Sequence, residues 1–263
     1  MTTQNHIKQN AIQLLKKMIA TPSFSKEEKE VADLLESFLK ENQIPAHRFL
    51  HNIYAFNKAF NPHLPSILLN SHHDTVKPAP GYSDNPFLAR EKDGKLIGLG
   101  SNDAGGPLVA LIATFIHFYN HANLPFNLIL AATAEEEISG KNGIEALLAE
   151  SSFCSALQGS AIVGALVGEP TQMKMAVAER GLMVIDALAV GKAGHAARNE
   201  GVNAIEIAVR DIETLLTLPF DKVSELTGES RATVTVIETE NKAHNVVPSE
   251  CRFVIDLRIN ECY

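Results

Sequence analysis

The first forty residues carry apolar positions at the spacing of amphipathic helices. Apolar side chains recur every three or four positions over residues 7–19, which predicts a helix there. Ser25 is followed three positions later by Glu28, the pattern of a capping box, and predicts the start of a second helix that runs through Leu39. The chain is therefore expected to begin with two helices that each bury one face.

Short apolar runs of strand length follow these helices. They lie at residues 52–56, 66–70, 127–132 and 161–167. The last three are almost wholly apolar, and helical patterns at residues 107–119 and 143–150 lie between them. Continuous apolar strands that alternate with helices predict a mostly parallel or mixed sheet with helices on both faces. The fold class expected for this part of the chain is α/β.

The pattern changes after Pro170. An alternating run, a helical run and two strand-like runs follow, at residues 182–190, 202–216, 233–237 and 253–257. This β-α-β-β order predicts the start of a ferredoxin-like α+β unit. We place the boundary near residues 171–176, which gives domains at residues 1–174 and 175–263. The chain stops after a strand, where such a unit still needs a helix and a strand, so we expect the second domain to be incomplete.

Composition and charge narrow the class of protein. The 263 residues are 45% hydrophobic and 21% charged, so a large core can form, which excludes a disordered chain and a disulfide-dependent mini-fold. The formal net charge of −8 argues against nucleic acid as a partner. The three cysteines form no C-x-x-C pair, and neither a signal peptide nor a membrane-spanning run occurs. We expect a cytoplasmic protein that binds no membrane.

Polar clusters follow the predicted strands, where open α/β sheets place their ligands. In the first cluster, His72 and Asp74 are two positions apart, and an extended chain puts both on one side, as a metal-binding histidine with its orienting carboxylate requires. Two surface histidines in a polar loop are the alternative. The second cluster is rich in glycine, but Asp103 stands where a dinucleotide loop needs its third glycine. An ionised Asp103 before a helix could hold a cation. Taken alone, however, the motif favours a glycine-rich turn capped by an aspartate.

Acidic residues dominate the other two clusters. Glu135, Glu136 and Glu137 follow a buried strand, and Glu169 follows the next. Three adjacent carboxylates are ordinarily a solvated helix start, but at a buried strand end their repulsion favours a bound cation. One histidine and several carboxylates without cysteine are the donor set of a catalytic divalent-metal site. No G-x-S-x-G or Walker motif occurs, so metal-dependent hydrolysis is the predicted chemistry.

Together these motifs resemble, in order and spacing, the metallopeptidases of family M20. The matching segments are His72–Val76, Gly100–Asp103, Thr133–Glu137 and Val167–Thr171. Within the family they are most similar to acetylornithine deacetylases and succinyl-diaminopimelate desuccinylases. The resemblance implies a catalytic domain with an inserted dimerisation (lid) domain, a homodimer, and two divalent metal ions. Zinc is the expected metal, with cobalt or manganese as alternatives.

The resemblance also implies roles for individual residues. Glu136 is implied as the general base, and Asp74 as the residue that orients a histidine ligand. Asp103 is implied to bridge the two metals and to form a cis peptide bond with Ala104. The implied metal ligands are His72, Asp103, Glu137 and Glu169.

In the second domain, His195 is similar to the family histidine that reaches the partner subunit's active site and stabilises the oxyanion. Arg180, Asn245 and Arg258 resemble substrate-contacting positions, although Arg258 could instead pair with a nearby acid. The family's last metal ligand is a histidine far towards the C-terminus, and this chain ends before any such segment. We therefore expect either a fragment of a longer enzyme or a chain that binds its second metal poorly.

The resemblance implies removal of the acyl group from a small N-acyl amino acid. N-acetylornithine or N-succinylornithine of arginine biosynthesis is the first expectation. Citrulline, diaminopimelate and dipeptide substrates of the same family are alternatives. A different alternative is a non-catalytic, dimer-forming or binding remnant.

Overall fold

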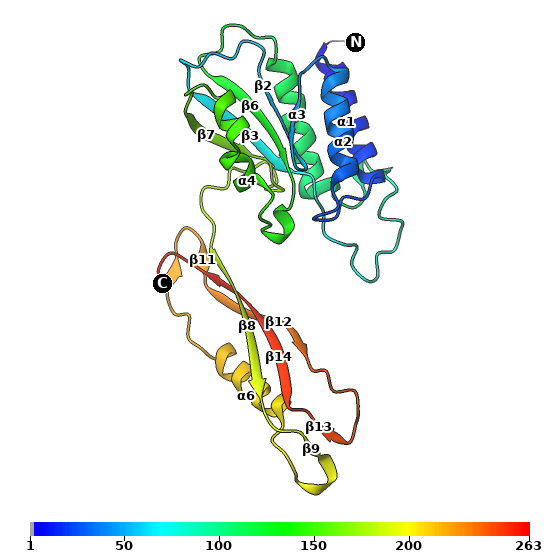
Figure 1. Ribbon diagram of the computed structural model, residues 1–263, viewed down its shortest axis with the longest axis vertical. Coiled ribbons are helices and arrows are strands. Elements are labelled where there is room, and N and C mark those ends of the chain that lie inside the picture. The colour runs from blue at the N-terminus through cyan, green and yellow to red at the C-terminus, as the bar shows by residue number, and fades with distance from the viewer. Residues whose placement is uncertain (1–2) are drawn as a thin grey trace. The chain divides into compact units, whose positions relative to one another are not determined.

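The computed structural model describes residues 3–263 (Figure 1). The chain forms two compact units, which divide between Met173 and Lys174. No helix within residues 3–263 combines the length and the apolar character that crossing a membrane requires.

The first unit is built on a five-stranded sheet with the order β1-β2-β6-β3-β7. Its strands are β1 (His47–Phe49), β2 (Asn52–Phe56), β3 (Ser66–His72), β6 (Asn127–Thr133) and β7 (Ile162–Val167). Strand β3 runs parallel to both β6 and β7, whereas β2 is antiparallel to β6 and to β1. The expectation of a mixed sheet with helices is confirmed.

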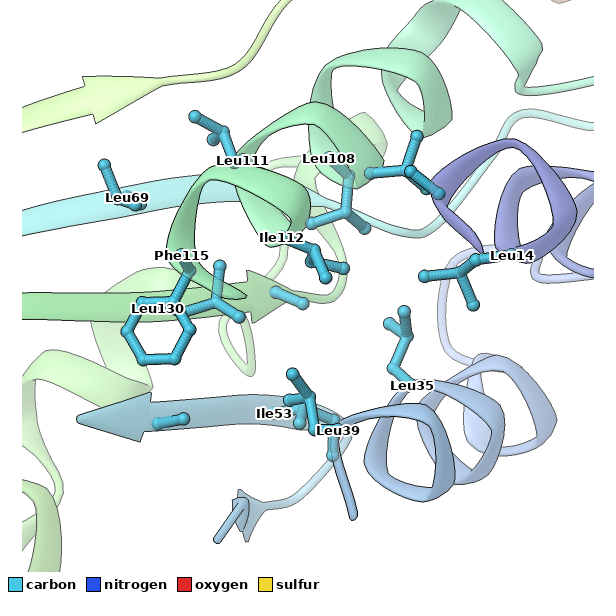
Figure 2. Packing of buried hydrophobic residues seen from close by; sticks show 14 of the residues in the cluster. Leu14, Leu35, Leu39, Ile53, Leu69, Leu108, Leu111, Ile112, Phe115 and Leu130 are labelled. Atoms are coloured by element: carbon cyan, nitrogen blue, oxygen red, sulfur yellow. The ribbon is translucent and has the colours of Figure 1, made fainter. Parts of the chain in front are cut away.

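Helices cover both faces of this sheet. They are α1 (Thr3–Ala20), α2 (Lys29–Glu41), α3 (Gly106–Phe118), α4 (Ile144–Ala149) and α5 (Ser151–Ala156). Figure 2 shows Leu14, Leu35 and Phe115 from α1, α2 and α3 meeting over the strands, and all three are buried in the larger core. Leu147 of α4 and Phe153 of α5 pack in a second core on the opposite face. A short hairpin, β4 (Arg90–Lys92) and β5 (Lys95–Ile97), precedes α3.

Strand β7 differs from the buried strand that its apolar sequence predicts. It forms the edge of the sheet, and Val163, Leu166 and Val167 are each more than half exposed. No element of the described chain covers β7 on both faces as β3 and β6 are covered. Apolar composition alone does not distinguish a central strand from an edge strand.

The start of α2 also differs from the prediction. The helix begins at Lys29, and its N-cap residue Glu28 makes no side-chain cap. The Ser25 hydroxyl donates to Oδ2 of Asp74 at 2.7 Å instead of capping the helix. The predicted capping box is therefore wrong, because the Ser25 hydroxyl bonds to the buried carboxylate of Asp74, just after β3, and not to the helix backbone.

The second unit contains an antiparallel sheet and one helix. Strands β8 (Gly181–Val190), β12 (Arg231–Glu238) and β14 (Glu250–Ile259) have the order β12-β14-β8, and α6 (Ala204–Leu216) packs on them through Ala204 and Ala208. The elements follow one another as β-α-β-β along the chain. Two short pairs complete it, β9 (Gly194–His195) with β13 (Val246–Val247) and β10 (Val223–Ser224) with β11 (Gly228–Glu229).

Candidate metal centre

Four segments of the first unit meet at the carboxyl ends of its parallel strands. His72 is the last residue of β3 and lies in register with Thr133 at the end of β6, so the loop after Thr133 begins beside it. Glu169 follows β7, which pairs with β3 on the other side. Asp103 lies in the turn η1 (Ser101–Gly105) that leads into α3, and its peptide bond to Ala104 is cis. The topology thus brings distant acidic residues to one histidine.

The distances define a compact donor cluster. Nε2 of His72 lies 3.1 Å from Oδ1 of Asp103, 3.7 Å from Oε2 of Glu136 and 3.8 Å from Oε1 of Glu169. The potential ligand atoms of His72, Asp103 and Glu137 all lie within 4.8 Å of one another. His72 is buried, whereas Asp103 and Glu136 are exposed. One buried imidazole therefore faces several carboxylates that open to solvent.

Asp74 fixes the orientation of the His72 ring. Nδ1 of His72 lies 3.0 Å from the backbone oxygen of Asp74 and 3.3 Å from its Oδ1. A carbonyl oxygen only accepts hydrogen bonds, so Nδ1 carries the hydrogen and Nε2 is the nitrogen directed at the carboxylate cluster. This is the arrangement in which a histidine presents one nitrogen to a metal ion.

The charges of the cluster shift the pKa values of its members. Burial acts to lower the pKa of His72, but the hydrogen bond to Asp74 and the charges of Asp74, Glu169 and Glu136 outweigh it and raise the pKa to about 9. Burial raises the pKa of Glu137, and the Asp103 carboxylate raises it further. Burial likewise raises the pKa of Glu169. Each shift favours a state with less negative charge, which a bound cation also supplies.

The loop after β6 is held by hydrogen bonds to Asp74. Its Oδ1 accepts the backbone N–H of Glu136 at 3.1 Å, and its Oδ2 accepts that of Glu137 at 3.2 Å. Burial acts to raise the pKa of Asp74, but the hydrogen bonds from His72, Ser25 and the Glu136 N–H lower it overall. The ionised carboxylate of Asp74 therefore supports both the histidine and the acidic loop.

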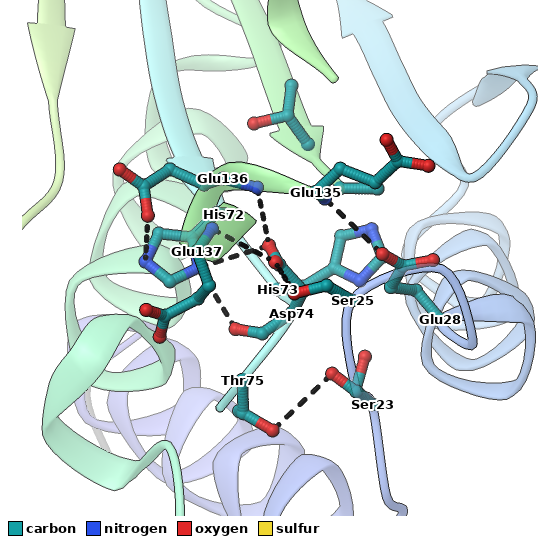
Figure 3. Close-up of polar contacts among 12 residues, drawn as sticks. Ser23, Ser25, Glu28, His72, His73, Asp74, Thr75, Glu135, Glu136 and Glu137 are labelled. Atoms are coloured by element: carbon teal, nitrogen blue, oxygen red, sulfur yellow. Dashed lines mark hydrogen bonds and ion pairs between the residues drawn. The ribbon is translucent and has the colours of Figure 1, made fainter. Parts of the chain in front are cut away.

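Glu135 does not belong to the donor cluster. Its backbone is left-handed (φ 56°, ψ 24°), and Figure 3 shows its side chain directed away from the side on which Glu136, Glu137 and His72 lie. Its buried carboxylate accepts hydrogen bonds from Nδ2 of Asn142 at 2.8 Å and from the Asn142 backbone N–H at 3.3 Å. The three adjacent carboxylates of the sequence are thus divided between two roles.

Glu28 contacts the same loop, and Ser25 contacts Asp74, which holds it. Neither was predicted as a site residue. Glu28 is fully buried, and its Oε1 accepts the backbone N–H of Glu135 at 3.3 Å. Nδ1 of His51 lies 2.8 Å from Oε2 of Glu28. The Ser-x-x-Glu spacing matched a capping box, so the sequence offered a local explanation for both residues and no signal of a long-range contact.

The predicted site residues of the second unit form two groups within that unit. Arg180 donates from Nη1 to the Glu229 carbonyl at 2.8 Å, and it lines a cleft of about 400 Å³ together with Arg258. Arg258 donates to both carboxylate oxygens of Asp256 at 2.9 and 3.0 Å, so the acid pairing that its sequence also allowed is present.

His195 and Asn245 form the second group. The backbone oxygen of Asn245 accepts the N–H of Ala196 at 3.0 Å, beside the pairing of His195 with Val246. Nδ1 of His195 accepts the N–H of Ala197 at 3.2 Å, which leaves its Nε2 for another partner. His72 and the carboxylates around it belong to the other unit.

The donor set is of the kind that holds a divalent metal ion in hydrolases. Solved structures share the fold of this chain. An M20 family metallo-carboxypeptidase of Sulfolobus solfataricus matches all of this chain and 72% of its own, with a TM-score of 0.66 and 16% identity. Human carnosine dipeptidase 1 matches 97% of this chain and 72% of its own, with a TM-score of 0.65 and 17% identity.

Comparison of the chain's sequence with protein-family models identifies the family to which it belongs. The model of peptidase family M20/M25/M40 matches residues 68–252, more than half of the chain, and the chain belongs to this family. A succinyl-diaminopimelate desuccinylase of Roseobacter denitrificans is 30% identical over 209 residues, which are 76% of this chain and 54% of the relative. One from Cereibacter sphaeroides (strain ATCC 17025) is 29% identical over 262 residues, 93% of this chain and 66% of the relative. The chain thus spans about half to two thirds of these relatives.

Proposed function

We propose that this chain carries the metal-binding site of a hydrolase that cleaves the acyl amide bond of an N-acylated amino acid. The observation that supports it is the convergence of His72, Asp103 and Glu137 within 4.8 Å, with the Glu136 carboxylate 3.7 Å from the same imidazole. Family membership supplies the reaction class, because the matched family consists of peptidases. The geometry of the site supports the residue roles that we propose.

The donor set fits divalent metal ions. A single imidazole with carboxylates and no thiolate suits zinc, and cobalt or manganese as alternatives. We assign His72 and Glu169 to one ion, Glu137 to a second, and Asp103 to both. Such ions supply Lewis acidity and lower the pKa of water. Burial, with a smaller contribution from neighbouring carboxylates, raises the pKa of Glu137 and of Glu169, and the carboxylates around His72 raise its pKa. Nearby positive charge would offset these shifts, which fits the assignment.

Glu136 is the proposed general base. Its carboxylate is exposed and reaches the cluster without belonging to the tightest group of donors. It would accept a proton from the attacking water as the new C–O bond forms at the acyl carbon. It would then deliver that proton to the amine as the C–N bond breaks, so that the products are a carboxylate and a free amino group.

Residues of the second unit are proposed to bind the substrate. Arg180 and Arg258 line one cleft, and guanidinium groups suit substrate carboxylates. We assign Asn245 to the same role. His195, whose Nδ1 accepts the Ala197 N–H, is proposed to stabilise the tetrahedral oxyanion of a neighbouring subunit in a homodimer.

The relatives change the preferred substrate. The two described above are named for succinyl-diaminopimelate, not for acetylornithine. We therefore place N-succinyl-diaminopimelate first and N-acetylornithine second, which reverses the order expected from the motifs alone. The arginine-biosynthesis assignment has no support among these relatives.

A direct assay tests the function. The chain, loaded with zinc or cobalt, is given N-succinyl-diaminopimelate and N-acetylornithine separately, and the free amino group is measured. Release from the succinyl substrate that excess chelator abolishes supports the proposal, and preference for the acetyl substrate overturns the specificity. A chain that binds metal but releases neither amine contradicts the hydrolase proposal and favours the non-catalytic binding alternative.

A further inference from the structure

Three consecutive backbone N–H groups of the acidic loop end on two buried carboxylates. The Glu135 N–H donates to Oε1 of Glu28, and those of Glu136 and Glu137 donate to Oδ1 and Oδ2 of Asp74. Glu28 is fully buried, and Asp74 is 1% exposed. These three hydrogen bonds to buried side chains define where the loop lies.

Glu28 and Ser25 come from the segment before α2, more than a hundred positions from the loop. The Ser25 hydroxyl donates to Oδ2 of Asp74 at 2.7 Å, the oxygen that also accepts the Glu137 N–H. Glu28 has a third partner in the backbone N–H of Lys26, at 2.6 Å. Lys26 itself has a left-handed backbone (φ 75°), an uncommon state for a non-glycine residue that its surroundings must maintain. The turn thus places Glu28 against the loop and Ser25 against Asp74.

The left-handed conformation of Glu135 is what separates the acidic side chains. It directs the Glu135 carboxylate to Asn142, while Glu136 and Glu137 face His72 (Figure 3). Glu28 holds the N–H of this same residue, and Asp74 holds the next two. A shift of the loop at Glu135 would therefore move the proposed base and a proposed metal ligand together.

We propose that Ser25 and Glu28 are positioning residues that hold the Glu135–Glu137 loop in the geometry its carboxylates need for binding metal and transferring a proton. This inference rests on the proposed function, since it concerns the same site. Neither side chain is assigned contact with metal or substrate. They act through the loop's backbone and, for Ser25, through Asp74.

The test compares Ser25→Ala, Glu28→Gln and Glu28→Ala with wild type. Glu27→Gln is the matched control, because Glu27 is the exposed neighbour of Glu28. Cobalt affinity is measured by calorimetry, the visible spectrum of bound cobalt reports ligand geometry, and thermal unfolding of the metal-free protein reports stability. Steady-state kinetics with N-succinyl-diaminopimelate gives kcat and KM.

We expect Ser25→Ala and Glu28→Gln to weaken cobalt binding by about 10- to 100-fold, as loss of an outer partner of a metal ligand typically does. The cobalt spectrum should change, and kcat should fall with KM nearly unchanged. Glu28→Gln keeps a side-chain carbonyl that can accept the Glu135 N–H, so it should retain more affinity than Glu28→Ala. Glu27→Gln should behave as wild type.

Other outcomes would distinguish failure of the positioning role from failure of the proposed hydrolase function. If Ser25→Ala and Glu28→Gln lower only the unfolding temperature, while the folded protein keeps wild-type cobalt affinity and spectrum, the residues are merely structural and the positioning role is overturned. If wild type binds cobalt but hydrolyses no N-acyl amino acid, the proposed function fails while the cobalt measurements still decide the positioning role. If wild type binds no cobalt, both fail.

Discussion

Gly140 and Glu135 lie so close that a Cβ added to the glycine would stand 2.2 Å from Oε2 of the glutamate. The glycine is thus required by a neighbouring side chain. The Glu135 carboxylate occupies that space because its left-handed backbone turns it towards Asn142. One small residue thereby permits the separation of Glu135 from the two acidic residues that face His72.

Replacing Gly140 with alanine should therefore destabilise the first unit. The added methyl must displace the buried Glu135 carboxylate, and overpacking of this kind typically costs roughly 1–3 kcal/mol. Denaturant unfolding of Gly140→Ala measures the loss. Gly164→Ala is the matched control, because an added Cβ there meets no atom within 4 Å and the backbone is not left-handed. Equal stability of the two variants would contradict the packing argument.

Glu136→Gln should lower turnover by at least ~10²-fold, because an amide cannot accept and return the proton that a general base transfers. Metal content should stay at the wild-type level, since Glu136 is assigned no metal. Kinetics and elemental analysis of the same sample check both points. Glu145→Gln, which changes an exposed acid on α4, is the control. Retained activity in Glu136→Gln would make the base assignment wrong.

Metal uptake should release protons at neutral pH. The pKa of His72 is raised to about 9, so below that pH the metal-free imidazole carries an extra proton, which a metal ligand must lose. Calorimetric titration with zinc at pH 7.5, in buffers of different ionisation enthalpy, should give close to one proton released by His72 per chain. His72→Ala should lose this release together with most of the affinity. Zinc binding without proton release would contradict the raised pKa.

Stability should fall on acidification through His73. Burial lowers the pKa of His73 to about 4, well below its ordinary value of 6.5, and the backbone hydrogen bond to His51 only partly opposes this. Between these pH values the unfolded chain binds the proton and the folded chain does not, so the stabilisation present above pH 6.5 is lost as the pH falls towards 4.

The His73→Gln variant isolates this effect. Its free energy of unfolding should decline less than that of wild type between pH 7 and pH 4, by roughly 3 kcal/mol at most. Urea titrations at several pH values of the metal-free proteins measure both curves. Parallel curves would show that His73 is not responsible.

Much of the fold could be predicted because burial leaves a strong pattern. The apolar runs at residues 66–70 and 127–132 lie within the observed strands β3 and β6. His72 and Glu137 were found as candidate ligands because they come directly after these two runs or shortly beyond them. The exposed edge strand β7 and the direction of the Glu135 side chain could not be predicted. The exposure of β7 depends on which elements pack beside it in the fold. The direction of the Glu135 side chain depends on the left-handed backbone of one residue among three identical glutamates.

Ser25 and Glu28 illustrate the same difficulty. Their local spacing had a sufficient explanation in a helix cap, yet both side chains bond to groups far away in the sequence. Pairings between distant polar side chains leave no periodic signal, so only the fold reveals them.

The most direct test of the central claim is a crystal structure of the chain with zinc, with diffraction recorded on both sides of the zinc absorption edge. The account predicts an anomalous peak at about 2.0–2.2 Å from Nε2 of His72 and from carboxylate oxygens of Asp103 and Glu169, and a second peak beside Glu137. Fully occupied zinc elsewhere, with no peak at His72, would contradict it.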